Sequence, residues 1–454
     1  MTVAATRSNG VGGAFPRAAP NLLLQLETLL AFGFLITFVQ VFWPPDTFFI
    51  RPKGGAFGES HFYDTTTIVS LYVFLAVVIY IRRAAFPILL RVAWPILALT
   101  LLALVSAYWS DDPLLVIRRT GTVFATTLFA VYLVARGDLG ELAALMVKVY
   151  AFAMAASFAI LILSPALATS NNEGYTHAIR GAFTDKNQLG AACGLGIIFS
   201  VYAFCNRFGS RVLAGFVFTA GVVLLKLSES RTPLVMMMAV LYGALVCSAL
   251  RRRSGVGALI GFALIVVGLA GVAALAIDPT GVLVALGRDP TLTNRTPLWH
   301  LVWGYIVQRP WLGYGYETFW RLDGPEANNI WATVHWIAPH AHNAWLELAL
   351  GLGVVGVFFG IVVWLTVFTR FARIATAPAA RHAVFCTALA MGIFLENITE
   401  YAFFRRGEIL WLLFVVAFVE LGREMLEARR GRLALSAAAR AEMRRQWQSR
   451  RVLA

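Results

Sequence analysis

Apolar stretches long enough to cross a membrane recur along most of the chain. Each holds about 18 or more residues with few charges, and short polar connections separate them. A backbone within a bilayer must satisfy its own hydrogen bonds, and these stretches are too long for barrel strands, so we predict an all-α polytopic membrane protein. The pattern indicates about twelve transmembrane helices, at roughly 21–43, 65–81, 85–107, 120–136, 141–163, 187–206, 212–227, 232–250, 256–277, 343–368, 382–398 and 408–421.

One segment, residues 278–342, breaks this pattern. It is the longest polar connection between two spans. Thr293 and Asn294 are suitable caps for a short helix that starts near Pro297, where apolar side chains recur at helical spacing. We predict that the loop contains short helices and that this one lies at the membrane interface.

The same segment is rich in aromatic side chains. Interfacial tryptophans commonly form a belt at the membrane surface, and this is one interpretation of the pattern. The other is a surface that stacks on sugar rings, for which Trp299, Trp311 and Tyr316 are candidate glycan contacts, with His340 as a further polar contact.

Composition and charge support a membrane protein and argue against nucleic-acid binding. Only 14% of the residues are charged, against about 25% in soluble proteins, and the mean hydropathy is +0.72. The net charge of +14 lies mostly in short loops and in the tail, which indicates topology and contact with anionic lipid.

Arginines in alternate connections then orient the chain. They place both termini in the cytoplasm and the long loop on the opposite face. We expect a cytoplasmic segment at 1–20, helices at 21–277, a periplasmic loop at 278–342, helices at 343–421 and a basic tail at 422–454. The tail is predicted to be a helix on the cytoplasmic leaflet.

Positive side chains occur at several span ends on the predicted outer face. Arg180 and Lys186 flank the start of the sixth span, where Asn187 is a suitable cap and the helix N-terminus favours anions. Arg231 lies in a very short connection and suits bidentate binding of phosphate. Ordinary caps and ion pairs, such as Arg231 with Glu229, are the alternative interpretation.

The long loop adds two more arginines. Arg288 and Arg295 lie among several hydroxyl side chains, and this combination fits the binding of phosphate or sugar. A capped turn with Arg288 paired to Asp289 explains the same residues.

The loop ends in two histidines, His340 and His342, at the mouth of the next span. A histidine there titrates near neutral pH and can act as a general base, although a structural role is the alternative. No third histidine or carboxylate stands at metal-ligand spacing, so we expect neither a metal site nor a cofactor.

Together these features predict a cationic, partly aromatic pocket at the outer leaflet. Such a pocket suits a substrate with a lipid tail, a diphosphate and sugars. Arginines would neutralise the diphosphate leaving group, and a histidine would deprotonate an attacking sugar hydroxyl.

Four stretches of the sequence resemble the bacterial O-antigen ligase / O-antigen polymerase superfamily, with a closer likeness to exopolysaccharide polymerases of the succinoglycan type. The likeness covers roughly residues 65–420. The stretches are 110–113 with Arg118 and Arg119, 180–190, 287–299 and 342–351.

The resemblance implies a GT-C-like glycosyltransferase that uses undecaprenyl-diphosphate-linked glycans at the periplasmic face, without a metal. The family's histidine precedes Asn, Ser or Gln at the start of a helix, which matches His342 rather than His340. Its arginines near the diphosphate match Arg180 and Arg231, with Arg288 or Arg295 from the loop.

We therefore predict a polysaccharide polymerase of the bacterial inner membrane. Its expected partners are the lipid-linked donor, a glycan or lipid A–core acceptor and membrane lipids, with a chain-length regulator as a further class and no nucleic acid. A ligase acting on lipid A–core would share the donor and the chemistry. A polysaccharide transporter is the alternative from another class, but it would place more ionisable residues deep in the spans.

Overall fold

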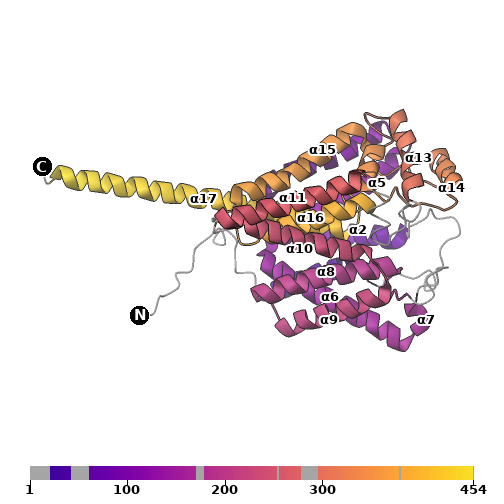
Figure 1. Ribbon diagram of the computed structural model, residues 1–454, viewed down its shortest axis with the longest axis horizontal. Helices are drawn as coiled ribbons and strands as arrows, with labels where there is room; N and C mark the ends of the chain where they lie inside the picture. Colours follow the sequence, from indigo (N-terminus) through magenta and orange to yellow (C-terminus); the bar gives the residue numbers. More distant parts are fainter. Residues whose placement is uncertain are drawn as a thin grey trace.

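The computed structural model is a helical bundle from which one long helix projects (Figure 1). It describes residues 21–41, 61–169, 178–252, 255–277, 295–377 and 380–452. Within these ranges, extended backbone pairs in an isolated bridge between Thr169 and Ile179. The all-α prediction is confirmed.

Each predicted span coincides with a helix or a pair of helices. The elements are α1 (Asn21–Val39), α2 (His61–Ile81), α3 (Phe86–Val92), α4 (Trp94–Val105), η2 (Ser106–Tyr108), α5 (Pro113–Arg136), α6 (Leu139–Leu163), α7 (Pro165–Ala168), α8 (Lys186–Asn206), α9 (Arg211–Ser228), α10 (Thr232–Arg251), α11 (Gly255–Ile277), α13 (Arg295–Gln308), α14 (Pro325–Val334), α15 (Ala344–Ile374), α16 (Ala383–Thr399) and α17 (Ile409–Val452).

Several of these helices can cross a membrane by length and composition. Within the described ranges seven qualify, and an eighth does if α2 and α3, which are bent by 113°, count as one span. Three shorter apolar helices, α4, α11 and α16, accompany them. The multi-pass prediction is confirmed, whereas the count of twelve stays a prediction.

The first part of α17 lies at the centre of the bundle. Residues 409–422 are buried throughout and pack against α5, α15 and α16. A helix that is apolar all round belongs in such a core. Its Trp411 and Phe414 pack with Trp364 and Phe403, and the ring centroids of these contacts are 4.5 to 5.7 Å apart. The span predicted at 408–421 is therefore the core of the fold.

The rest of α17 carries the basic tail. The predicted helix is present, and Figure 1 shows it continuing the axis of α17 away from the bundle. The tail extends the buried part of α17 without a break, and its contact with the cytoplasmic leaflet stays a prediction.

The bundle has two distinct ends. We call the end that carries α13 and α14 the site end, and the end where α17 leaves the bundle the opposite end (Figure 1). Arginines from the connections predicted to be cytoplasmic meet at the opposite end. Arg82 donates to the backbone oxygen of Arg136 (3.3 Å), and Arg381 pairs with Asp138 (2.7 Å). Their gathering agrees with the alternation of basic loops along the sequence.

A break in α15 connects the long loop to the bundle. Gly353 adopts a left-handed conformation (φ 63°), which interrupts the helical hydrogen bonds. The N–H groups of two consecutive loop residues, Tyr314 and Gly315, donate to the free carbonyls of Leu350 and Gly351 at 2.9 Å each. The loop is therefore fastened to α15 through backbone atoms.

Candidate functional site

The long loop has an apolar core of its own. The helix predicted near Pro297 is present as α13, while its two predicted cap residues lie outside the described residues. α13 buries Leu298, Val302 and Ile306, which recur every four residues along one face. They pack with aromatic side chains of the loop and of α14, so the loop forms a folded unit above α15.

The stretch 110–113, part of the resemblance, holds this unit on the bundle. Two of its carboxylates pair with arginines of the loop: Asp111 lies 3.7 Å from Arg309, and Asp112 lies 3.7 Å from Arg321. Residues on either side of the stretch also bind the loop. The Trp109 indole N–H donates to Leu312 O (3.0 Å), and Arg119 donates to Glu317 O. These contacts give the stretch an anchoring role.

Three tryptophans hold the chain around the two histidines. Each donates a hydrogen bond from its indole N–H: Trp331 to Ala338 O (2.8 Å), Trp299 to Ala341 O (2.7 Å) and Trp320 to Glu347 Oε1 (2.7 Å). Sequence reasoning offered a membrane belt or a sugar surface for such residues, and it missed this bracing function. Only the spatial position of each indole reveals it.

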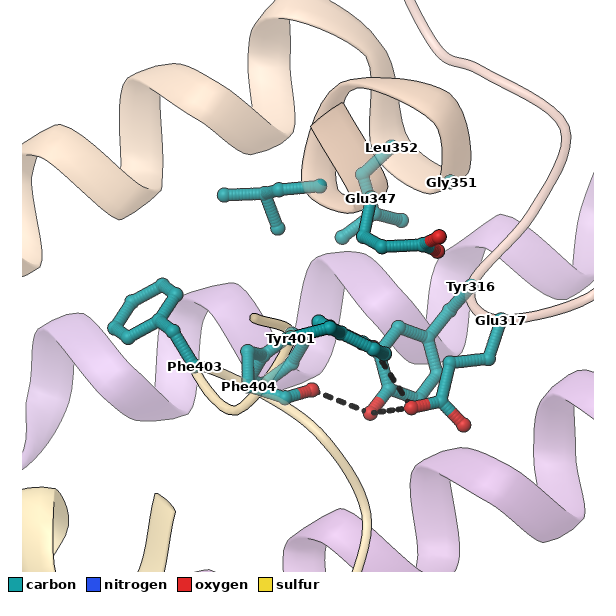
Figure 2. A pocket seen from close by; sticks show the side chains of 9 residues that line it. Tyr316, Glu317, Glu347, Gly351, Leu352, Tyr401, Phe403 and Phe404 are labelled. Atoms are coloured by element: carbon teal, nitrogen blue, oxygen red, sulfur yellow. Dashed lines mark hydrogen bonds between the residues drawn. The ribbon is translucent and has the colours of Figure 1, made fainter. Parts of the chain in front are cut away.

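The predicted glycan contacts differ in their surroundings. Trp311 is largely exposed, whereas Tyr316 is buried and donates its hydroxyl to Phe404 O (2.7 Å). Figure 2 shows Tyr316 beside Glu317 and Tyr401 in a narrow pocket. The geometry thus gives Tyr316 a structural contact, and glycan contacts here stay a prediction.

His342 lies at the mouth of α15 with one ring nitrogen engaged. Its Nδ1 is 3.2 Å from Glu400 Oε2, and no hydrogen bond from a described residue engages its Nε2. The side chain is 19% exposed. Its backbone is left-handed (φ 49°), an uncommon state for a residue other than glycine. The following residue, Asn343, caps α15 by accepting from Trp345 N and Leu346 N (2.9 and 3.1 Å).

His340 supports its neighbour. Its ring lies tilted against that of His342, with centroids 4.2 Å apart, and its Nδ1 accepts the backbone N–H of His342 (3.2 Å). Burial, together with the charge of Arg405, holds the pKa of His340 well below its usual value. A neutral, buried ring suits a support better than a base that must meet substrate, so the geometry favours His342 over His340.

Arg295 is committed to the same cluster. Its guanidinium lies 2.6 Å from Glu400 Oε1 and donates to Thr399 O. The structure therefore brings Arg295 close to His342 through a shared carboxylate. Arg288 lies outside the described residues.

A second group of cations lies at the starts of α8 and α10. Arg180 donates to Leu167 O (2.9 Å) and Thr184 O (3.2 Å), which fixes its guanidinium on the backbone. Lys186 begins α8, and the exposed side chain of Arg231 makes no hydrogen bond or ion pair with any described residue. A bond of 3.2 Å between Ser230 Oγ and Asn187 Oδ1 joins the two helix starts.

The cap of α8 differs from the prediction. Asp185, not Asn187, accepts the backbone N–H groups at the helix start (2.7 and 3.1 Å). Both residue types cap helices well, and they stand two positions apart, so the sequence alone did not decide between them.

Helix packing brings Arg231 to the same end as His342. α10 and α16 run antiparallel, and Gly392 approaches the backbone of Met236 closely. With a rise of about 1.5 Å per residue, Arg231 lies about 7.5 Å beyond that contact and Glu400 about 12 Å beyond it. The two therefore end within about one helical turn of each other along the bundle axis.

Glu400 is the main residue that sequence reasoning missed. It follows α16 in a short connection and binds both His342 and Arg295. Burial alone would raise the pKa of Glu400, but the hydrogen bond from His342 and the charge of Arg295 outweigh it and lower the pKa. A carboxylate beside a run of arginines was visible in the sequence, but its partners were not.

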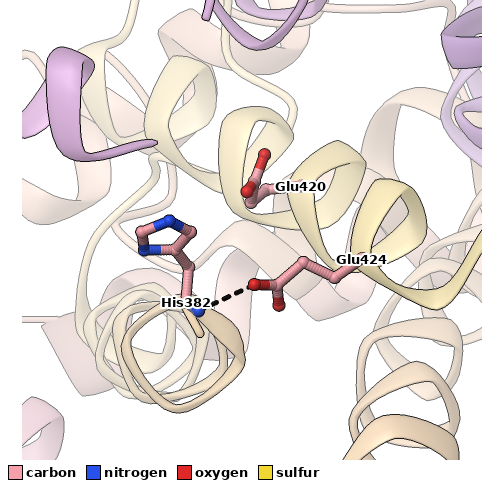
Figure 3. A group of neighbouring side chains, drawn as sticks. All are labelled: His382, Glu420 and Glu424. Carbon is pink, nitrogen blue, oxygen red and sulfur yellow. Dashed lines mark hydrogen bonds between the residues drawn. The ribbon is translucent and has the colours of Figure 1, made fainter. Parts of the chain in front are cut away.

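A second histidine cluster lies at the opposite end. Figure 3 shows His382, Glu420 and Glu424, all buried and with donor atoms near enough to suggest a metal site. Each has partners already: His382 lies against Tyr202 Oη and 2.7 Å from Asp138 Oδ1, Glu420 binds Arg423 (2.7 Å), and Glu424 accepts the backbone N–H of His382 (2.7 Å). We interpret the group as a set of contacts that joins the start of α16 to α17.

Comparison with known proteins agrees with the resemblance seen in the sequence. A family domain described as O-Antigen ligase matches residues 214–361, which include Arg231, Arg295 and His342. The Exopolysaccharide production protein ExoQ of Rhizobium meliloti (strain 1021) is 29% identical over 290 residues, which cover 60% of this chain and 64% of that relative. The chain thus matches slightly less than two thirds of the relative's length. On these findings residues 214–361 are similar to the O-antigen ligase family, and the chain is similar to an exopolysaccharide production protein, in agreement with the resemblance to the O-antigen ligase/polymerase superfamily.

Proposed function

We propose that the protein is a membrane glycosyltransferase that polymerises lipid-linked polysaccharide repeats. It transfers a growing glycan from undecaprenyl diphosphate to a sugar hydroxyl of another lipid-linked repeat. The observation that carries the proposal is His342, a partly exposed imidazole whose Nδ1 is engaged and whose Nε2 is unengaged by any described residue.

The chemistry follows from the positions of the side chains. His342 Nε2 takes the proton of the acceptor hydroxyl while its oxygen attacks the anomeric carbon of the donor sugar. The bond between that carbon and the phosphate oxygen breaks, and the diphosphate leaves with the electron pair. Arg231, with its exposed guanidinium, and the nearby Arg180 and Lys186 are the candidates to stabilise the leaving group electrostatically.

The orientation belongs to the same proposal. The site end faces the periplasm, both termini face the cytoplasm, and the chain resides in the bacterial inner membrane. The support is the gathering of basic connections at the opposite end, since positively charged loops stay in the cytoplasm. Reaction of a site-end cysteine variant, such as Asn328→Cys, with an impermeant thiol reagent in intact cells tests this orientation.

A ligase that transfers the glycan to lipid A–core is the second candidate. The family description of residues 214–361 as an O-antigen ligase favours it. Purified protein given labelled lipid-linked repeats, without lipid A, separates the two. A polymerase makes a ladder of products, whereas a ligase makes none until its acceptor is added.

A further inference from the structure

We infer that Glu400 is a positioning residue for His342, and that Arg295 holds Glu400 in place rather than binding the donor diphosphate. The inference rests on the proposed role of His342 as the base. It assigns a function to a carboxylate that sequence reasoning did not select, and it changes the function predicted for one arginine.

The two oxygens of Glu400 have different partners. Oε1 lies 2.6 Å from a guanidinium nitrogen of Arg295, and Oε2 lies 3.2 Å from His342 Nδ1. The backbone N–H of Glu400 donates to Glu396 O (2.8 Å), which continues the hydrogen bonds of α16 by one residue. A carboxylate fixed at both oxygens and at its backbone can define the position of the ring it contacts.

The charge state of Glu400 determines which ring nitrogen carries the proton. Its pKa is lowered, because the His342 hydrogen bond and the Arg295 charge outweigh the effect of burial. An ionised carboxylate only accepts hydrogen bonds. In neutral His342 the proton therefore resides on Nδ1, and Nε2 keeps the lone pair that a base needs.

The remaining faces of the ring are packed as well. Trp336 lies 5.7 Å from the His342 ring and His340 lies 4.2 Å from it, measured between centroids. These contacts restrict the tilt of the imidazole. The imidazolium formed during reaction would stay next to the carboxylate, which stabilises its charge.

Arg295 already uses two of its five N–H donors on acceptors within the protein. Its guanidinium is bonded to the Glu400 carboxylate and to Thr399 O. A diphosphate would have to compete with a carboxylate already in place. Arg231, by contrast, is exposed and unpaired among the described residues, so the two arginines have different functions.

The test uses the full-length protein, purified in lipid nanodiscs, with labelled lipid-linked repeats as substrate. We expect Glu400→Gln to lower kcat by about 10- to 1,000-fold, which is less than the total contribution of a general base, with little change in KM. The acid limb of the pH–rate profile shifts, because Glu400→Gln removes a negative charge next to the reacting centre. Sodium formate restores part of the activity of Glu400→Ala, since it supplies a carboxylate to the gap.

Two further variants protect the test against a folding defect. Glu400→Asp keeps the charge, and we expect partial activity with the acid limb unmoved. Glu408→Gln is the matched control: like Glu400, Glu408 is a carboxyl that lies near an arginine, Arg405 (3.7 Å), but it has no hydrogen bond with His342. It should leave both kcat and the profile near wild type.

The outcomes separate the inference from the proposed function. If His342→Ala abolishes extension while Glu400→Gln retains kcat and the pH profile, the positioning role is wrong and the function stands. If His342→Ala extends glycans normally, the proposed base itself is wrong. If Arg295→Ala raises KM for the donor without moving the pH profile, Arg295 binds the diphosphate and that part of the inference fails.

Discussion

Two histidines at opposite ends of the bundle are built from the same kinds of residue. His342 at the site end and His382 at the opposite end each lie beside a carboxylate that also contacts an arginine. They differ in exposure, 19% against 4%, and in the ring atoms that are engaged. His382 has Tyr202 and Asp138 on its two nitrogens, whereas His342 has a described partner on one. The comparison shows that a free ring nitrogen, rather than the set of residues, distinguishes the proposed base from a histidine that joins helices.

The strongest test of this comparison replaces each histidine in turn. We expect His342→Ala to lower kcat by about 100- to 10,000-fold, the usual range for loss of a general base. His382→Ala should leave turnover per folded molecule near wild type, but it should lower the free energy of unfolding by about 1–3 kcal/mol, because the ring contacts with Tyr202 and Asp138 are lost. Ladder formation, normalised to the folded fraction, and thermal unfolding measure the two effects. A loss of turnover in His382→Ala at full folding would break the distinction.

The second test addresses how the site end is anchored. A Cβ at Gly353 would lie 2.2 Å from the backbone of Trp311, and the φ of 63° disfavours other residues. We expect Gly353→Ala to lower the free energy of unfolding by about 2–5 kcal/mol, from overpacking and backbone strain together. Gly407→Ala is the control, because Gly407 has a similar φ of 65° with open space around it. This variant should lower the free energy of unfolding by about 1–2 kcal/mol. Equal losses in the two variants would contradict the anchoring role.

The third test concerns free and engaged arginines. Arg231→Ala should lower kcat/KM by about 10- to 100-fold, as expected for loss of a charge-assisted hydrogen bond to the leaving group. Arg231→Lys should recover part of this loss. Arg381, which is exposed at the opposite end and pairs with Asp138, provides the control, and Arg381→Ala should change kcat/KM by less than about twofold. Steady-state rates at several donor concentrations measure kcat/KM. An unchanged kcat/KM in Arg231→Ala would exclude binding of the diphosphate by Arg231.

The smallest expected effect lies at Asp138. Its hydrogen bond with His382, helped by Gly140 N and the charge of Arg381, lowers the pKa of Asp138 despite partial burial. A carboxyl whose pKa is lower in the folded state stabilises the fold above its unfolded pKa of about 3.9, and this stability is lost as the pH falls below that value. Because Asp138 is 35% exposed, solvent screens its contacts. We therefore expect its carboxylate to contribute about 1 kcal/mol to the free energy of unfolding. Thermal unfolding of wild type and Asp138→Asn between about pH 7 and pH 3 should show that the variant loses less stability than wild type as the pH falls.

Local patterns in the sequence predicted the helices and several site residues. Apolar length located helices at each predicted span, and basic loops marked the opposite end of the bundle, because both signals depend on neighbouring residues. His342 was chosen by its place before Asn343, and Asn343 is indeed the cap of α15. The start of α13 at Arg295 agrees with the helix predicted near Pro297.

The partners of these residues could not be predicted in the same way. Arg295 and Glu400 are 105 positions apart, and Trp299 and Ala341 are 42 positions apart. Such pairs depend on how the helices pack, and the local spacing of residues in a single sequence does not predict this packing. The same limit explains why Glu400 was overlooked and why its pairing with Arg295 was not predicted.

The break at Gly353 has a consequence for how the chain enters the membrane. A straight helix carries all its backbone bonds into lipid, but α15 has carbonyls at Leu350 and Gly351 that bond to residues from outside the helix. A carbonyl left unsatisfied in hydrocarbon is costly. The partners at Tyr314 and Gly315 precede α15 in the chain, so they are synthesised first. We expect α15 to settle at its final depth only after that loop has docked, which would make assembly of the site a condition for completing the span.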